Sequence, residues 1–355
     1  MPSSANRLTK DKRPTIALVL GSGGARGYAH VGVLEVLQER GYNIVAIAGC
    51  SMGALVGGIY AAGKLTQFKD WTTGLGQFDI LRLLDISLSS PGAIRGEKVF
   101  SVVRELIGDV RIEDLPLSYT AVAADLLHHK EIWFQEGPLH KAIRASVAIP
   151  SLITPVVYGE RVLVDGGLLN PLPIIPTIAA HADYIVAVNL SFYDERSESL
   201  LFKQAKSKVG LDDWMSGLKQ KAAQLFDRDT KAVMTAVQTD EVTQTLSHAS
   251  TAESSSADEV PTGALIEPGT LADEEMRQLA IGKFDIMNLA FETMQSSLTQ
   301  YKLAGYPPDI LINVPKGVCR TFDYHKAPEL IQLGRHLATE VLDKAEAEGR
   351  LKPKG

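Results

Sequence analysis

The stretch Ile44–Gly63 contains no charged residue, yet glycines and a serine near its centre prevent it from being one continuous element. It opens with the β-branched run Ile44–Ala48, typical of a buried strand, and closes with the small-residue helical pattern Ala54–Ala62. The turn between them, Gly49–Gly53, reads GCSMG. Strand, turn and helix in this order are the context of the G-x-S-x-G nucleophile elbow, whose glycines leave room for a strained turn. We therefore predict that Ser51 is a nucleophile.

Two other interpretations of this stretch were weighed. A tight turn between a strand and a helix can contain serine without any chemistry, because short motifs often occur by chance. A membrane-spanning helix has about the right length, but the central turn divides the stretch and leaves a helix too short to span a bilayer.

Composition bounds the class of protein. With 355 residues, 45% of them hydrophobic and 22% charged, the chain can bury a large core. The formal net charge of −6 argues against a nucleic-acid partner. Two cysteines, Cys50 and Cys319, make no disulfide framework, and residues 1–14 lack the apolar region of a signal peptide. We expect a cytoplasmic protein, or one peripheral on the inner membrane surface.

A glycine-rich loop follows the first predicted strand. Thr15–Leu20 runs into Gly21–Gly27 (GSGGARG), and a helix then leads to the strand that carries Ser51. Such a unit makes the two strands parallel neighbours, so the loop and Ser51 lie side by side. A dinucleotide site needs an acidic residue at the end of the second strand, and a P-loop needs Gly-Lys-Ser/Thr; both are missing. We favour an oxyanion hole, the alternative being a turn that only allows close packing.

A later predicted strand ends in a residue with a carboxylate side chain. The segment 155–165 predicts two short strands around a Gly-Glu turn, and the second strand ends in Asp165, followed by Gly166 and Gly167. An aspartate that only caps a turn is the alternative. As the base for Ser51, either Asp165 acts directly, which requires burial or positioning to make it basic enough, or His325 completes a triad.

These motifs together resemble the patatin-like phospholipase family. Residues 22–27 (SGGARG) are similar to its G-G-G-x-R/K-G loop, with Ser22 in place of the first glycine, and the turn around Ser51 and Asp165-Gly166-Gly167 match its G-x-S-x-G and D-G-G/A. The likeness spans about residues 14–190 and resumes weakly near 309–337. It implies a three-layer α/β/α fold with a central, mostly parallel sheet. It also implies a Ser51–Asp165 dyad without histidine that cleaves acyl esters of lipids with no calcium or other cofactor.

The resemblance also assigns supporting roles. Arg26 either pins the glycine-rich loop or meets a lipid phosphate. No metal site is expected, since His128 and His129 have no partners at ligand spacing and are interpreted as exposed turn residues. The predicted oxyanion donors are Gly23, Gly24 and Ala25, and the predicted supporting residues are Arg26, Gly27, Gly49, Gly53, Gly166 and Gly167.

The predicted domain organisation is a disordered tail at 1–13, a catalytic core at 14–198, a helical elaboration at 199–303, a final strand and helix at 304–348, and a tail at 349–355. The elaboration includes a low-complexity insert at about 239–262. Its lysine-rich stretch Leu200–Val237 is typical of an amphipathic helix on an anionic membrane, or of a helix packed on the core.

We expect a serine acyl hydrolase of lipid carboxylic esters, of the phospholipase A or lysophospholipase type, acting on a lipid ester or phospholipid at a membrane surface. Three rivals stay open: a histidine-assisted esterase using His325, a catalytically silent lipid-binding or regulatory protein of the same fold, and a nucleotide binder using the glycine-rich loop. No oligomeric state is predicted.

Overall fold

The computed structural model describes residues 14–83, 96–150, 152–193 and 283–352. The chain divides into two compact units, residues 1–201 with 290–355 and residues 202–289. The predicted tail at 1–13, the lysine-rich helix and the low-complexity insert lie outside the described residues. The expected domain boundaries therefore stay a prediction, and the fold below is that of the first unit.

The described residues form one eight-stranded sheet in the order β5-β6-β3-β2-β1-β7-β8, with β4 also paired to β3. β1, β2, β3, β7 and β8 run parallel, whereas β4 and β6 run antiparallel to β3. This mixed, mostly parallel sheet confirms the predicted fold class. The strands are β1 Thr15–Leu20, β2 Asn43–Cys50, β3 Ser118–Asp125, β4 Lys130–Phe134, β5 Val156–Tyr158, β6 Arg161–Asp165, β7 Tyr184–Phe192 and β8 Ile310–Pro315.

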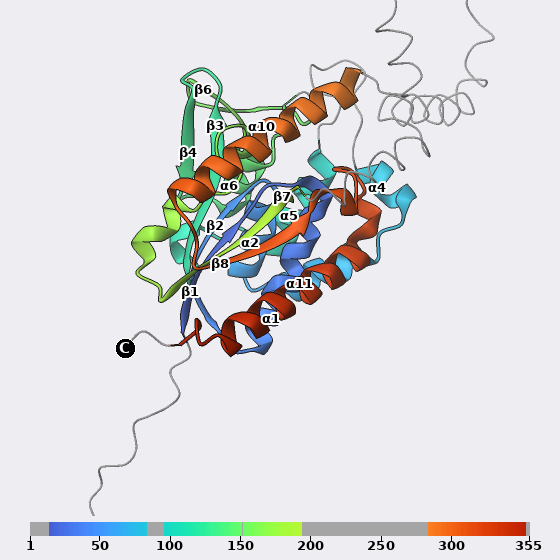
Figure 1. Cartoon of the computed structure of the whole chain (residues 1–355). Coiled ribbons are helices and arrows are strands. Elements are labelled where there is room, and N and C mark those ends of the chain that lie inside the picture. Colours follow the sequence, from blue (N-terminus) through green and yellow to red (C-terminus); the bar gives the residue numbers. More distant parts are fainter. Residues whose placement is uncertain (1–13, 84–95, 151, 194–282, 353–355) are drawn as a thin grey trace, which may run out of the picture. The chain divides into compact units, whose positions relative to one another are not determined.

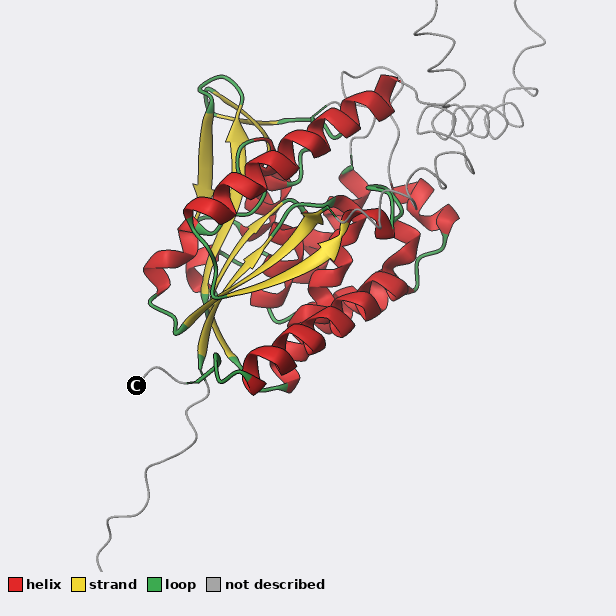
Figure 2. Ribbon diagram, viewed as in Figure 1, coloured by secondary structure: helices red, strands yellow, loops and turns green. Residues whose placement is uncertain are grey.

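Alternation along β1 shows why both faces of the sheet are covered. Leu18 and Leu20 join the large core that includes α1 and α11, whereas Val19 points to the other face and packs with Leu172 and Ala187. The result is a three-layer arrangement of helices, sheet and helices (Figure 2). The helices are α1 Ala29–Glu39, α2 Met52–Ala61, α3 Leu65–Thr73, α4 Gln77–Leu83, α5 Glu97–Ile107, α6 Leu139–Ser146, α10 Lys283–Gly305 and α11 Ala327–Ala347.

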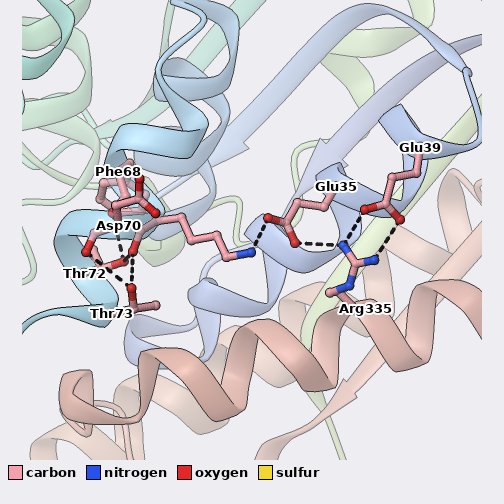
Figure 3. A network of polar contacts seen from close by, with 8 residues as sticks. Glu35, Glu39, Phe68, Asp70, Thr72, Thr73 and Arg335 are labelled. Carbon is pink, nitrogen blue, oxygen red and sulfur yellow. Dashed lines mark hydrogen bonds and ion pairs between the residues drawn. The ribbon is translucent and has the colours of Figure 1, made fainter.

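Charged side chains join helices from opposite ends of the chain. Arg335 of α11 contacts Glu35 and Glu39 of α1 at 2.9 and 2.7 Å, and Lys69 of α3 contacts Glu35 at 2.6 Å (Figure 3). The apolar face that α1 and α11 share packs the final helix on the first one, and this network lies beside it.

Most elements lie where the sequence predicts them. Helix α10 lies at the C-terminal end of the expected helical elaboration and is described from Lys283, and a strand, β8, and a helix, α11, follow it. None of the helices among the described residues is both long and apolar enough to cross a membrane.

Candidate active site

Ser51 sits in a strained turn between β2 and α2. Its backbone has φ 56° and ψ −125°, a conformation that residues other than glycine rarely adopt. A Cβ on Gly53 would lie 2.0 Å from the carbonyl oxygen of Leu20, and one on Gly49 would lie 2.5 Å from Gly53, so both positions require glycine. The turn therefore has the form of a nucleophile elbow, with the amino end of α2 directly after the serine.

The sheet itself brings Asp165 to Ser51. Val122 of β3 pairs with Cys50, the last residue of β2, and the next residue, Ala123, pairs with Asp165, the last residue of β6. Val122 and Ala123 both pair with β4 as well, so β2 and β6 share the opposite edge of β3 and meet end to end there. At this meeting point the Ser51 hydroxyl donates to Oδ2 of Asp165 at 2.5 Å.

The backbone of Ser51 is held by a second serine. The Ser51 N–H donates to Oγ of Ser146 at 3.0 Å, and the Ser146 hydroxyl donates to the Val122 carbonyl at 2.6 Å. Ser146 is fully buried at the end of α6. It therefore ties the elbow to β3, the strand that aligns Ser51 with Asp165.

Burial dominates the electrostatics of Asp165, which is 1% exposed. Burial raises the pKa of its carboxyl to about 6, opposed by hydrogen bonds from the Ser51 hydroxyl, the Gly167 N–H at 2.7 Å and the Cys50 thiol at 3.8 Å. Burial, reinforced by the charge of Asp165, also raises the pKa of the Cys50 thiol, which keeps it a neutral donor. Asp165 is thus a carboxylate able to exchange a proton near neutral pH.

The three sequence motifs converge. A Cβ on Gly27 would lie 2.3 Å from Cβ of Met52, so the glycine-rich loop packs against the first residue of α2. A Cβ on Gly167 would meet the Ser22 hydroxyl oxygen at 2.8 Å, and one on Gly166 would meet the Val122 carbonyl oxygen at 2.2 Å. The loop, the elbow and the Asp165 turn are therefore in mutual contact.

The amides of the glycine-rich loop are not equivalent. The Ser22 N–H donates to the Pro171 carbonyl and the Ala25 N–H to the Thr321 carbonyl, each at 2.8 Å. Ala25 is therefore not the free donor that the sequence predicts, because the segment after β8 occupies it. For the N–H groups of Gly23 and Gly24, no acceptor is found among the described residues. These two amides are therefore the candidates for the oxyanion donors.

Arg26 anchors the loop. Its side chain is buried, contacts Glu292 of α10 at 3.1 Å, and approaches the carbonyl oxygens of Lys316 and Cys319 at 3.4 and 3.5 Å. Lys316 contacts the same carboxylate at 3.0 Å. Burial by itself raises the pKa of Glu292, but the two cations outweigh it and lower the pKa to about 2. These contacts support a role for Arg26 in holding the glycine-rich loop in place, and not a role as a ligand of a lipid phosphate.

Helix α10 supplies side chains that sequence reasoning missed. Glu292 also accepts from the Thr321 hydroxyl, Gln295 donates to the Ser22 hydroxyl at 3.0 Å, and Lys302 pairs with Glu131 at 3.1 Å. These positions recur at helical spacing, and Glu292 and Gln295 are buried. In the sequence these residues read as ordinary polar positions of a helix, so no local signal marked them.

An apolar cavity of about 110 Å³ begins at Ser51. Tyr324, in the segment after β8, lines it and stacks edge-on against Tyr28 with ring centroids 6.2 Å apart. His325, the candidate base, is not among the lining residues. The other residues around the cavity are Met52, Leu55, Phe68, Trp71, Leu75, Ile80, Leu83, Gly96, Val99, Phe100, Val103, Val147, Ile149 and Ile153.

The described residues hold no group of three or more histidine, cysteine or acidic side chains placed to bind a metal ion. Ser51 and Asp165, beside the apolar cavity, can perform proton transfer and nucleophilic attack by the serine.

The chain is similar over nearly its whole length to known proteins. Residues 18–178 match the family model described as patatin-like phospholipase. The chain is 44% identical over 354 residues to an uncharacterised NTE family protein of Mycobacterium tuberculosis, with 98% of this chain and 97% of the relative covered. A lysophospholipase of Debaryomyces hansenii is 30% identical over 191 residues, which cover 52% of this chain and 12% of that protein.

Among solved structures, VipD from Legionella pneumophila has a similar fold. The TM-score is 0.50 and the sequence identity 15%, and the match covers 94% of this chain and 67% of VipD. At this identity the likeness concerns the fold alone.

Proposed function

Because the chain belongs to the patatin-like phospholipase family, we propose that it cleaves carboxylic esters of phospholipids or lysophospholipids through a Ser51–Asp165 dyad. At the level of the family it is a hydrolase of lipid esters. The observation that carries the proposal is the 2.5 Å contact between the Ser51 hydroxyl and the buried Asp165 carboxylate at the wall of an apolar cavity. The apolar lining of the cavity suits the part of an acyl chain next to the ester, which supports a lipid as the substrate.

In the first half of the reaction, Oγ of Ser51 attacks the ester carbonyl carbon while its proton passes to Oδ2 of Asp165. The carbonyl oxygen becomes negative and accepts from the N–H groups of Gly23 and Gly24; each such donor contributes about 3 kcal/mol to lowering the barrier. The bond to the leaving alcohol then breaks, the alcohol takes the proton from Asp165, and an acyl-serine remains.

In the second half, a water molecule attacks the acyl carbon and gives its proton to Asp165. The bond to Oγ of Ser51 breaks, Ser51 regains the proton from Asp165, and a fatty acid leaves. A carboxyl with a pKa of about 6 suits both directions, because it accepts a proton more readily than an ordinary aspartate and still releases it near neutral pH.

The test measures fatty-acid release from phosphatidylcholine, lysophosphatidylcholine and triacylglycerol in the presence of EDTA. We expect release from the phospholipid or the lysophospholipid, no dependence on metal, and a fall of at least about 10³-fold for Ser51→Ala. A fluorophosphonate probe labels Ser51 in the parent and not in the variant. Absence of both labelling and release would favour the silent lipid-binding protein instead.

A further inference from the structure

We propose that the tips of the β3–β4 and β5–β6 hairpins form one lipid-docking surface through which the chain contacts a bilayer beside its active site. The hairpin-tip surface consists of Leu126, Leu127, Val157 and Tyr158. The inference rests on the proposed function in one respect, that the substrate resides in a lipid surface.

The register of the sheet places these side chains together. The Leu126 N–H donates to the Val162 carbonyl at 2.9 Å, and Val162 pairs with Val157 across the second hairpin. Tyr158 pairs with Arg161, and its ring lies edge-on to that of Phe134 of the first hairpin, with centroids 6.1 Å apart. The two tips are therefore neighbours in one sheet and not two separate loops.

All four side chains face solvent. The exposed fractions are 39% for Leu126, 59% for Leu127, 75% for Val157 and 60% for Tyr158. Leu163, one residue further into the sheet than this group, is fully buried. Val157 and Tyr158 are consecutive strand residues and therefore present apolar side chains on both faces of the hairpin. Four exposed apolar side chains on two neighbouring hairpin tips indicate a contact surface, since exposed apolar residues are normally single and scattered.

The hairpin-tip surface lies on the active-site side of the sheet. Val122 of β3 is level with Cys50 at the end of β2, and Leu126 comes four residues later. At about 3.3 Å per residue, the tip extends about 13 Å beyond the level of Ser51. Figure 1 shows the turns at the ends of β3, β4 and β6 gathered together. The cavity residue Ile153 comes three residues before Val156, the first residue of β5.

The chemistry of the hairpin-tip surface suits a bilayer interface. Aliphatic side chains enter the acyl region, and tyrosine is favoured at the level of the head groups. Lys130 is exposed beside the tip and can meet a lipid phosphate. Arg161 is exposed too, but its Nε lies 3.8 Å from the carboxylate of the buried Asp125, which also contacts His128, and Glu160 is an exposed acid of the same turns. The favoured occupant is therefore a lipid surface that carries phosphate head groups.

The test combines Leu127→Glu and Val157→Glu in a Ser51→Ala background, so that binding is measured without hydrolysis. Flotation with vesicles of equal parts phosphatidylcholine and phosphatidylglycerol measures binding. We expect the double variant to lose binding about tenfold or more, because two carboxylates would enter the apolar layer. Leu127→Ser with Val157→Ser repeats the test without added charge, and thermal melting shows that each variant is folded.

The matched control is Ile178→Glu in the same background. Ile178 is 48% exposed and lies in the helical turn before the first residue of β7, at the amino end of the parallel strands, whereas the hairpin tips lie beyond their carboxyl end, so its substitution is expected to leave vesicle binding unchanged. Equal binding by the double variant and its parent, or no binding by the parent, would overturn the proposal. The proposal would also fail if the parent protein is a dimer, the double substitution dissociates it, and vesicle binding is unchanged. The surface would then join two copies of the chain. Hydrolysis by the Ser51 form is scored separately, so loss of the proposed function is distinguished from loss of docking.

Discussion

Two buried carboxylates lie near the same catalytic loops, Asp165 at the end of β6 and Glu292 on α10. Asp165 is contacted by neutral donors, and burial raises its pKa to about 6. For Glu292, burial also raises the pKa, but Arg26 and Lys316 lie within 3.1 Å and lower it to about 2. Two residues of similar chemistry and burial thus differ by several pKa units because of the cations beside one of them.

The difference in pKa suits Asp165 to proton transfer and Glu292 to holding neighbouring segments together. A carboxylate without a neighbouring cation keeps an affinity for protons near neutral pH, which a base needs. A carboxylate between two cations stays ionised and acts as a fixed joint, here between the glycine-rich loop, α10 and the segment after β8. The following predictions test this contrast, from the largest expected effect to the smallest.

Asp165→Asn is expected to lower the turnover of lipid esters by about 10³-fold or more, because the amide keeps the shape of the carboxylate but cannot accept a proton. Steady-state kinetics on a lysophospholipid measure the effect. His325→Ala is the matched change for the rival mechanism and is expected to keep most of the activity. The reverse ranking of the two variants would establish the histidine-assisted esterase.

Glu292→Gln is expected to lower the free energy of unfolding by about 3–5 kcal/mol, since it leaves the buried Arg26 and the partly buried Lys316 without their counter-charge. Urea denaturation at pH 7 measures it. This stabilisation is complete above the ordinary carboxyl pKa of 4.5 and is lost as the pH falls toward 2. Glu39→Gln, in the exposed contact with Arg335, serves as the control and should change stability little (Figure 3). Equal losses for both variants would refute the anchoring role.

Asp165→Asn is expected to act on stability in the opposite direction. The folded-state pKa of Asp165 lies above its ordinary value, so the ionised form is penalised when folded, and the penalty is greatest above pH 6. Removing the charge should raise the free energy of unfolding at pH 8 by about 3 kcal/mol, and the gain should disappear near pH 4. Urea denaturation at both pH values measures this change in the free energy of unfolding. A variant less stable than the parent at pH 8 would contradict the claim that the ionised Asp165 destabilises the folded protein.

The pH dependence of hydrolysis gives the finest test. Because Asp165 must be ionised to accept the proton of Ser51, kcat/KM should fall about tenfold per pH unit below about pH 6. Cys50→Ala removes a donor to the carboxylate and should move the profile to higher pH by less than about one unit. A flat profile between pH 5 and 7 on a water-soluble ester would argue against Asp165 as the base.

The fold could be predicted in large part because its signals are local. The apolar strand before Ser51 and the glycine-rich loop after β1 define a β-loop-α-β unit within about forty residues, and the structure has it. The elbow requires glycine on both sides of Ser51 for steric reasons that hold in any context. The resemblance then named Asp165, whose own neighbourhood is equally typical of a turn-capping aspartate.

Other features of the site had no local signal. The occupation of the Ala25 amide by Thr321 joins residues 296 positions apart, and the choice of Tyr324 rather than His325 as a cavity wall depends on the path of the segment after β8. Glu292 and Gln295 read as ordinary helix positions until α10 is placed against the loop.

The sequence by itself determined the alternation of strands and helices, the strained turn at Ser51 and the identity of the groups able to react, because steric limits and apolar periodicity act over a few residues. The tertiary structure alone decided that β2 and β6 meet on one edge of β3, which brings a hydroxyl and a carboxylate from positions 51 and 165 into contact. It also decided which of the two buried carboxylates has a pKa close to neutral pH. That property depends on burial and on neighbouring cations, both of which are set by residues remote in the chain.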